Sequence, residues 1–121
     1  MPMRFRDLAP KVHLSLERDG ITVIAEREAR LLEAVDRVHS IKDAAREAGL
    51  SYRTAWSAIQ EIEKTLGRPV VTSRAGGAGG GGTTLTDECR DVLEWYRELH
   101  ARLDADLTRE GQASSAEAQP A

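Results

Sequence analysis

Residues 51–60 carry a closely spaced set of side chains that can read the edges of nucleic-acid bases. Arg53 can donate two parallel hydrogen bonds to a guanine, and serine, threonine and glutamine side chains suit weaker contacts with bases or phosphates. The alternative for Arg53 is a solvated charge on a helix surface, so its role depends on the element that carries it. The candidate DNA-binding residues of this segment are Ser51, Tyr52, Arg53, Thr54, Ser57 and Gln60.

A helix-turn-helix over residues 40–66 is the element that we predict. Ser40 can cap a first helix, and Gly49 can adopt the left-handed conformation that ends it. Ser51 then caps a second helix over residues 52–66, whose N-terminal residues would meet base edges in the major groove. The residues that should be buried are Ile41, Ala44, Ala45 and Ala48 on the first helix and Ala55, Ile59, Ile62 and Leu66 on the second, with Trp56 beside them.

A two-stranded wing over residues 69–86 should follow the second helix. Pro69 cannot continue a helical hydrogen-bond ladder, and β-branched residues predict strands at 70–72 and 83–85. Between the strands lies a glycine-rich loop whose backbone N–H groups can approach a phosphate closely. The candidate DNA contacts of the wing are Arg74, Gly76, Gly77 and Gly79.

The loop also has two other interpretations. Gly77-x-Gly79-x-x-Gly82 matches the glycine spacing of a dinucleotide-binding turn, but that turn must lead directly into a helix. No lysine follows the glycines, as a nucleotide-binding P-loop requires. We therefore expect no nucleotide cofactor, and a plain flexible linker is the remaining alternative.

The sequence resembles the N-terminal domain of the molybdate-responsive ModE regulators, which is similar to the winged helix-turn-helix of LysR-type regulators. The resemblance covers about residues 28–107. It implies a dimeric transcription factor in which the recognition helix faces DNA and Arg74 and the wing flank it. The motifs that carry it are Ser51-Tyr52-Arg53-Thr54-Ala55-Trp56, the glycine run after Arg74, and Leu85-Thr86.

Full-length members of that family carry a C-terminal oxyanion-binding module built of small β-barrels. Residues 112–121 are polar and alanine-rich, and we expect them to form no such module. The molybdate sensor that the resemblance implies is therefore not expected in this sequence. Control of molybdenum-related genes is an analogy at the level of the fold, and analogy does not establish function.

The flanking segments complete a fold that is mainly α with a small amount of β structure. Apolar and polar residues alternate on both sides of Asp19-Gly20, which predicts an N-terminal β-hairpin over residues 11–25. Helical spacing predicts a helix over residues 26–38. Residues 1–110 should form one winged helix-turn-helix domain.

A long C-terminal helix over residues 87–107 is the candidate dimerisation element. Its apolar stripe continues farther than so small a domain should cover, which favours pairing with a second copy. The alternative is that the stripe packs onto the domain's own core. We expect residues 111–121 to be a disordered tail. The predicted dimer-interface residues are Val92, Leu93, Tyr96, Leu99, Leu103 and Leu107.

Charge is distributed unevenly along the chain. The net charge is −3, whereas DNA-binding domains are often basic. Residues 40–86 contain six basic and four acidic side chains, giving +2, while residues 87–121 contain four basic and nine acidic side chains, giving −5. Because phosphate contacts dominate nonspecific affinity, we expect weak nonspecific binding and reliance on a dimer.

Other classes of function find little support. With no signal peptide and no long apolar run, we expect a cytoplasmic protein without membrane association. Cys89 is the single cysteine, and a packed thiol is favoured over a redox switch. We expect no metal site, no cofactor and no enzymatic activity, because the histidines lack ligand spacing and no nucleophile motif is present. These histidines are His13, His39 and His100.

The sequence thus predicts a transcriptional regulator that binds an inverted-repeat operator in double-stranded DNA as a homodimer. A small-molecule effector is not identified by any motif. The alternative is a protein-interaction module, which would use its apolar stripe and wing to dock on a partner regulator without specific DNA binding of its own.

Overall fold

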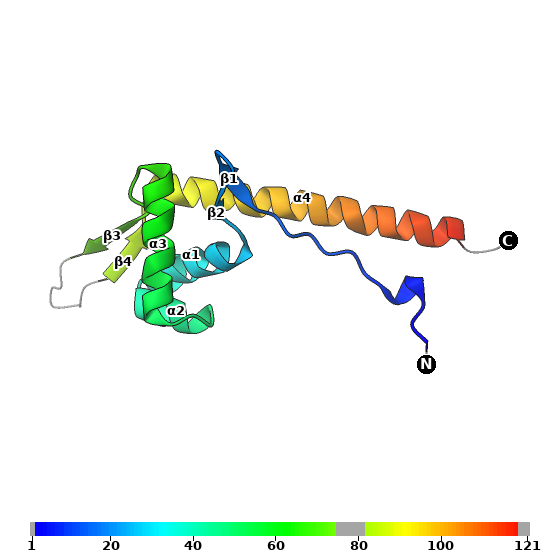
Figure 1. Cartoon of the computed structure of the whole chain (residues 1–121), viewed down its shortest axis with the longest axis horizontal. Coiled ribbons are helices and arrows are strands. Elements are labelled where there is room, and N and C mark those ends of the chain that lie inside the picture. The colour runs from blue at the N-terminus through cyan, green and yellow to red at the C-terminus, as the bar shows by residue number, and fades with distance from the viewer. Residues whose placement is uncertain (1, 75–81, 119–121) are drawn as a thin grey trace.

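A computed structural model describes the backbone of residues 2–74 and 82–118, with side chains of residues 2–74 and 82–111. The chain forms helices and two small hairpins around one core, and a long helix extends from it (Figure 1). The elements in chain order are η1 (Phe5–Asp7), β1 (Leu16–Arg18), β2 (Ile21–Ile24), α1 (Glu26–Val38), α2 (Ile41–Glu47), α3 (Tyr52–Leu66), β3 (Val71–Arg74), β4 (Gly82–Leu85) and α4 (Asp87–Ala118).

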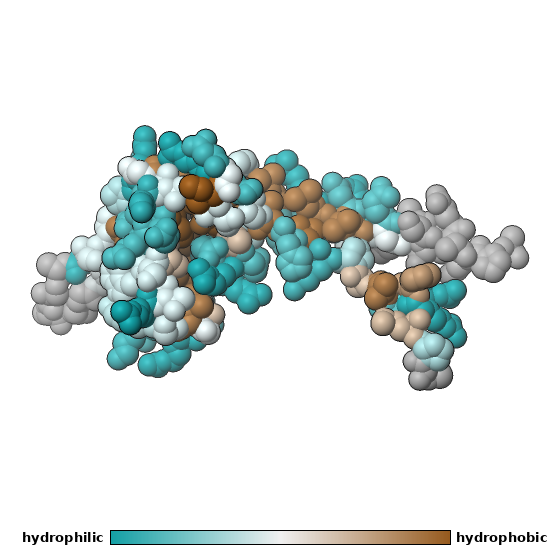
Figure 2. All heavy atoms as spheres, in the orientation of Figure 1, coloured by the Kyte–Doolittle hydropathy of each residue, from teal (hydrophilic) through white to brown (hydrophobic). Residues whose placement is uncertain are grey.

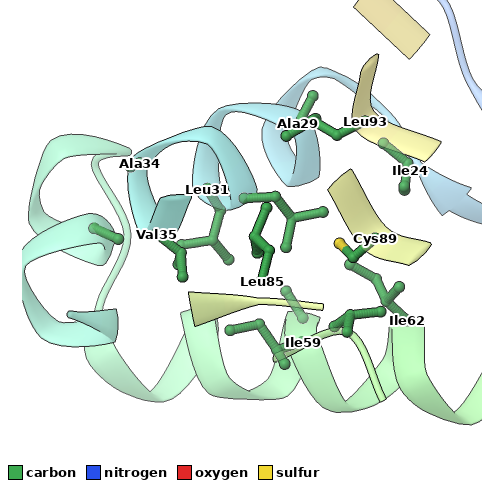
Figure 3. Packing of buried hydrophobic residues seen from close by; sticks show 14 of the residues in the cluster. Ile24, Ala29, Leu31, Ala34, Val35, Ile59, Ile62, Leu85, Cys89 and Leu93 are labelled. Atoms are coloured by element: carbon green, nitrogen blue, oxygen red, sulfur yellow. The ribbon is translucent and has the colours of Figure 1, made fainter. Parts of the chain in front are cut away.

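The core is formed where α1, α2 and α3 pack against one another. Leu31 and Val35 of α1 and Ile59 of α3 are fully buried and point into the same apolar space (Figure 3). Small residues such as Ala44 and Ala55 are also buried, which allows the helices to approach closely. Burying each large aliphatic side chain contributes about 1.5–3 kcal/mol.

The helix-turn-helix follows the predicted capping pattern. Ser40 Oγ accepts a hydrogen bond from the backbone N–H of Asp43 at 3.1 Å, and Ser51 Oγ accepts one from that of Thr54 at 3.0 Å. Gly49, with φ of +72°, adopts the left-handed conformation in the turn between α2 and α3. The prediction of a winged helix-turn-helix is confirmed, because the caps and the small residues of both helices act as the sequence indicated.

The wing is attached to the body at its base. Strands β3 and β4 pair antiparallel, from Val71 opposite Leu85 to Arg74 opposite Gly82. The backbone N–H of Thr83 donates to the carbonyl of His39 at 2.9 Å. A Cβ atom at Gly82 would lie 3.2 Å from that carbonyl oxygen, so a glycine allows the close approach. The predicted contacts Gly76, Gly77 and Gly79 lie outside the described residues.

The N-terminal hairpin is shorter than predicted. Its strands begin at Leu16 and end at Ile24, whereas the alternating pattern predicted a hairpin over residues 11–25. The reason is that Ala25 already belongs to the start of α1, where its N–H donates to Glu28 at 2.9 Å. Residues before Leu16 therefore have no strand opposite them. The turn residues Asp19 and Gly20 both have positive φ, as a tight hairpin turn requires.

Helix α4 begins on the core and then leaves it. The backbone N–H of Cys89 donates to Thr86 Oγ1 at 3.2 Å, so Thr86 caps the start of the helix. The helix continues to Ala118, beyond the predicted end at residue 107. Residues 111–118 are therefore helical in the structure, whereas the sequence predicted a disordered tail from residue 111. Alanine has the highest intrinsic helix propensity, and this segment is rich in it.

Candidate nucleic-acid interface

Helix α3 separates a buried face from an exposed polar face. Tyr52, Arg53, Ser57 and Gln60 are all exposed and fall within about 140° of arc at 3.6 residues per turn. The opposite side packs into the core through Ala55, Ala58, Ile59 and Ile62. Because the buried face holds the helix rigidly, the exposed side chains project from a fixed scaffold.

Two neighbouring elements hold the C-terminal end of α3. The guanidinium of Arg18 donates to the carbonyls of Thr65 and Leu66 at 3.0 and 3.1 Å, which satisfies acceptors that a helix end leaves free. The side chain of Glu63 accepts a hydrogen bond from the N–H of Val70 at 3.0 Å. The N-terminal hairpin and the wing thereby fix the direction of the helix.

Arg53 stands at the exposed N-terminal turn of α3. Among the residues that the structure describes, no carboxylate lies within ion-pair distance of its guanidinium. This distinguishes it from Arg37, which is paired with Glu47 at 2.5 Å, and from Arg68, which is paired with Glu88 at 2.6 Å. All the donors of Arg53 are available to an external acceptor.

Ser51 and Thr54 are tied to each other. Besides accepting the Thr54 N–H, the hydroxyl of Ser51 donates to Thr54 Oγ1 at 2.9 Å. The Ser51 hydroxyl thus serves the cap, and the Thr54 side chain is half-buried beside it. These two candidate contact residues help build the helix N-terminus, while Arg53 and Ser57 lie fully on the surface.

An aromatic pair flanks the same turn. The rings of Tyr52 and Trp56 meet edge to face, with centroids 6.3 Å apart and planes at 86°. Trp56 is half-buried and packs against the core, as the sequence predicted, whereas Tyr52 is 54% exposed. The contact restricts the orientation of the exposed Tyr52 ring.

Arg74 ends the described part of strand β3. Its side chain is exposed and makes no ion pair with a described residue. The neighbouring threonines Thr72 and Thr84 face each other across the wing, with their hydroxyl oxygens 3.0 Å apart. In Figure 1 the wing extends from the body beside α3, and Arg74 is the last residue of its strand β3.

Three further basic side chains were not identified as contacts by sequence reasoning. Lys42 and Arg46 are exposed on α2, opposite its buried face, and Lys64 shares the outer face of α3. None of them pairs with a carboxylate among residues 2–74 and 82–111. In a helix-turn-helix the first helix crosses the DNA backbone, so helical spacing alone could have identified Lys42 and Arg46.

Two of the four acidic residues in residues 40–86 have partners. Glu47 binds Arg37, and this hydrogen bond and the negative charge of Glu47 raise the pKa of that guanidinium. Glu63 accepts the Val70 N–H, while Asp43 and Glu61 are exposed and pair with no basic side chain among the described residues. The net charge of +2 therefore understates how many unpaired cations the surface presents.

The apolar stripe of α4 has two halves. Leu93 and Tyr96, which were predicted to lie in a dimer interface, are instead buried in the protomer's own core. The reason is that the first turns of α4 pack on α1, and the Tyr96 hydroxyl donates to the carbonyl of Leu14 at 3.1 Å. The core-packing alternative thus holds for this half.

The other half of the stripe is only partly covered by the described residues of the protomer. Leu99 and Leu107 are half-buried and Leu103 is 42% exposed, and Figure 2 shows a hydrophobic band along this projecting stretch. Trp95, which sequence reasoning did not include, is 53% exposed beside the half-buried Val92. The helical spacing of Trp95 to Val92 and Leu99 would have been the signal.

The remaining chemistry is modest. Burial raises the pKa of the Cys89 thiol to about 12, so the thiol stays protonated and unreactive. Within the described part of the chain, no three histidine, cysteine or carboxylate side chains gather as metal ligands would. No described helix has both the length and the apolar character to cross a membrane.

The sequence of this chain is similar to those of known regulatory proteins. Residues 27–90 match the family of bacterial regulatory helix-turn-helix proteins, lysR family. The chain is similar to the molybdenum transport protein ModE of Azotobacter vinelandii, with 41% identity over 79% of this chain and 36% of that protein. It is also 45% identical to the molybdenum-pterin-binding protein MopB of Rhodobacter capsulatus, over 71% of this chain and 32% of that protein.

A third relative is named for DNA binding. The DNA-binding transcriptional dual regulator ModE of Escherichia coli K12 is 36% identical over 58% of this chain and 27% of its own length. The chain thus spans about a third of the curated relatives that it matches. It belongs to the lysR family of bacterial regulatory helix-turn-helix proteins, and the part that it shares with the ModE regulators is their N-terminal DNA-binding domain.

Proposed function

We propose that this protein is a sequence-specific transcriptional regulator that acts in the cytoplasm and binds an inverted-repeat operator as a homodimer. The observation that supports it most is Arg53, exposed and unpaired at the capped N-terminal turn of a rigid α3. A buried or ion-paired arginine at this position would have argued against base contact.

Recognition would divide between the two helices and the wing. Arg53 reads a base edge in the major groove, where an arginine can bind a guanine through two hydrogen bonds. Ser51, Tyr52, Thr54, Ser57 and Gln60 contribute nearby contacts with bases or phosphates. Lys42, Arg46 and Lys64 bind backbone phosphates, as does Arg74 from the wing. The phosphate contacts position the protein and the base contacts specify the sequence.

The homodimer would form through the uncovered half of α4. Antiparallel pairing centred on Leu103 places Leu99 opposite the partner's Leu107 and brings the two Leu103 side chains together. Antiparallel pairing also puts the two helix-turn-helix bodies at opposite ends of the paired helices, since each body lies at the N-terminal end of its own α4 (Figure 1).

The relatives suggest which genes are concerned. Two of them are named for molybdenum transport or for binding a molybdenum-pterin. Control of molybdenum-related genes is the corresponding proposal for this chain. The shared region is the DNA-binding domain alone, so the proposal concerns the target genes and assigns no molybdate-binding site to the described residues.

The rival function is a protein-interaction module. It is favoured by the hydrophobic band of α4 and by the low positive charge of the DNA-facing region, since a partner regulator could cover the band. In that case α3 would contribute no sequence preference, and the two functions differ in a measurable way.

Selection from random duplex DNA tests the proposal. We expect enrichment of an inverted repeat with half-sites about 34–36 Å apart, one turn of DNA. Arg53→Ala should relax the preference at one position of each half-site by about 1–3 kcal/mol. Arg109→Ala, which removes a charge from the projecting end of α4, is the matched control. No enrichment, or a preference unchanged by Arg53→Ala, would contradict the assignment.

A further inference from the structure

The N-terminal arm, residues 2–13, contributes no residue to the described hydrophobic core of its own protomer. It leaves the body at Leu14, whose carbonyl accepts the Tyr96 hydroxyl, and then runs beside α4 and away from it (Figure 1). Phe5 is 94% exposed, Met3 72% and Leu8 59%. Three large apolar side chains on one projecting segment are costly to leave in water.

The tip of the arm has local structure that presents these side chains. Residues Phe5–Asp7 form the 3-10 helix η1, and the N–H of Arg4 donates to Asp7 Oδ2 at 3.0 Å. The N–H of Leu8 donates to the carbonyl of Phe5 at 3.1 Å, which closes the turn that carries these two exposed apolar side chains. The arm is also basic: Arg4, Arg6 and Lys11 outnumber its one acid, Asp7.

The N-terminal half of α4 offers a surface with the opposite properties. Asp91, Glu94 and Glu98 are exposed and form an acidic ridge at helical spacing. None of the three pairs with a basic side chain among the described residues. Trp95 lies beside the ridge, so acidic and apolar surface adjoin.

An apolar groove continues this surface toward the wing. Its lining includes Leu66, Pro69, Val70 and Val92, together with Cys89, Asp91 and the ion pair of Arg68 with Glu88. Val92 belongs both to the groove and to the stripe that would pair with a second copy. The groove is therefore continuous with the proposed dimer interface.

We propose that the N-terminal arm of one protomer docks on the N-terminal half of α4 of its partner. Phe5 and Leu8 cover Trp95 and the apolar groove, and Arg4, Arg6 and Lys11 face the acidic ridge. This inference rests on the proposed antiparallel homodimer. It assigns the arm and the ridge to one reciprocal contact, which occurs twice in the dimer because of the two-fold axis.

Direction and length select the partner's helix over the protomer's own. The arm runs toward the C-terminal end of its own α4 (Figure 1), whereas the acidic ridge lies at the N-terminal end, so the arm would have to reverse to reach it. From Leu14 to Phe5 an extended chain spans about 30 Å. The path along α4 from Tyr96 to Leu103, and on to the partner's Asp91, is about 28 Å at 1.5 Å per residue.

Cross-linking in the full chain tests the arrangement. Chains carrying Leu8→Cys are mixed with mass-tagged chains carrying Glu94→Cys and treated with a short bis-maleimide; the native Cys89 is buried. We expect a covalent pair of one chain of each kind. Replacing Glu94→Cys by Glu61→Cys, on α3, gives the matched control and should give no such pair. A Leu8→Cys/Glu94→Cys chain that links only within itself, or no link at all, would overturn the proposal.

Dimer affinity provides the second measurement. Phe5→Ser with Leu8→Ser should raise the dimer dissociation constant at least about tenfold, without changing the helical circular-dichroism signal. Arg6→Glu should also weaken the dimer, and adding Glu94→Arg should restore it. An unchanged dissociation constant, or Arg6→Glu lowering DNA affinity while the dimer is unaffected, would show that the arm does not act here. If the unaltered chain is monomeric, the homodimer itself fails; if it is dimeric without these effects, only the arm inference fails.

Discussion

Helix α3 and helix α4 are both long amphipathic helices, yet they expose opposite kinds of surface. The outer face of α3 carries Arg53, Ser57 and Gln60, and neither Arg53 nor Lys64 on this face pairs with a carboxylate of the described residues. The outer face of α4 carries Trp95 and Leu103 beside carboxylates. A polar, positive face suits a polyanion, whereas an apolar, negative one suits a protein surface. Each of the two helices thus uses one side for the fold and the other side for a different partner.

The division of α4 into a buried half and a projecting half predicts the largest effect of a substitution. Tyr96→Ala should lower the free energy of unfolding by about 3–5 kcal/mol, as for other buried aromatic side chains, and to the same extent at every protein concentration. Tyr96→Phe, which loses one hydrogen bond, should cost only about 1 kcal/mol. Urea unfolding at two concentrations measures both. A strong concentration dependence of the Tyr96→Ala effect would place Tyr96 in an interface instead.

Substitutions in the projecting half of α4 should instead weaken dimerisation. Leu103→Ala removes one apolar side chain from each of the two copies. Each loss should cost about 1.5 kcal/mol of dimerisation free energy, so the dimer dissociation constant should rise roughly a hundredfold. Sedimentation equilibrium measures it. The control is Ala105→Ser, an exposed position on another face of α4. If Leu103→Ala leaves the association state unchanged, the hydrophobic band has another function.

On α3, the capping role of Ser51 can be separated from its proposed role in DNA binding. Ser51→Ala removes the acceptor for the Thr54 N–H and should cost about 1 kcal/mol of stability. Ser51→Asp keeps a capping acceptor and favours the helix dipole, but it adds negative charge at the DNA-facing turn. We therefore expect a stable Ser51→Asp protein with weakened DNA binding, as measured by thermal unfolding and fluorescence anisotropy. Unchanged DNA affinity of Ser51→Asp would indicate that DNA does not contact this turn.

The smallest expected effects concern phosphate contacts. Lys42→Ala and Arg46→Ala should each weaken binding to all sequences alike and reduce the slope of log affinity against log salt by about 0.9. Arg74→Ala should do the same from the wing. Arg109→Ala on α4 serves as the control and should leave the slope unchanged. Titrations at several salt concentrations distinguish these residues from Arg53, which should alter base preference.

Much of the DNA-facing half could be predicted from the sequence because its determinants are local. The caps Ser40 and Ser51, the left-handed Gly49 and the three- and four-residue spacing of small apolar residues all act over one or two helical turns. The same is true of the turn at Asp19-Gly20. Helix α3 therefore has the predicted bounds and the predicted exposed face.

The rest depended on contacts between segments far apart in the chain. Periodicity placed Tyr96 and Leu103 on one stripe, but only the packing of α1 and Leu14 against α4 decided that Tyr96 is core and Leu103 is surface. The hairpin ended early because Ala25 was needed for the start of α1. Side-chain spacing determines which residues share a face of a helix; how much of that face is covered depends on where the neighbouring elements end, and this only the tertiary structure decides.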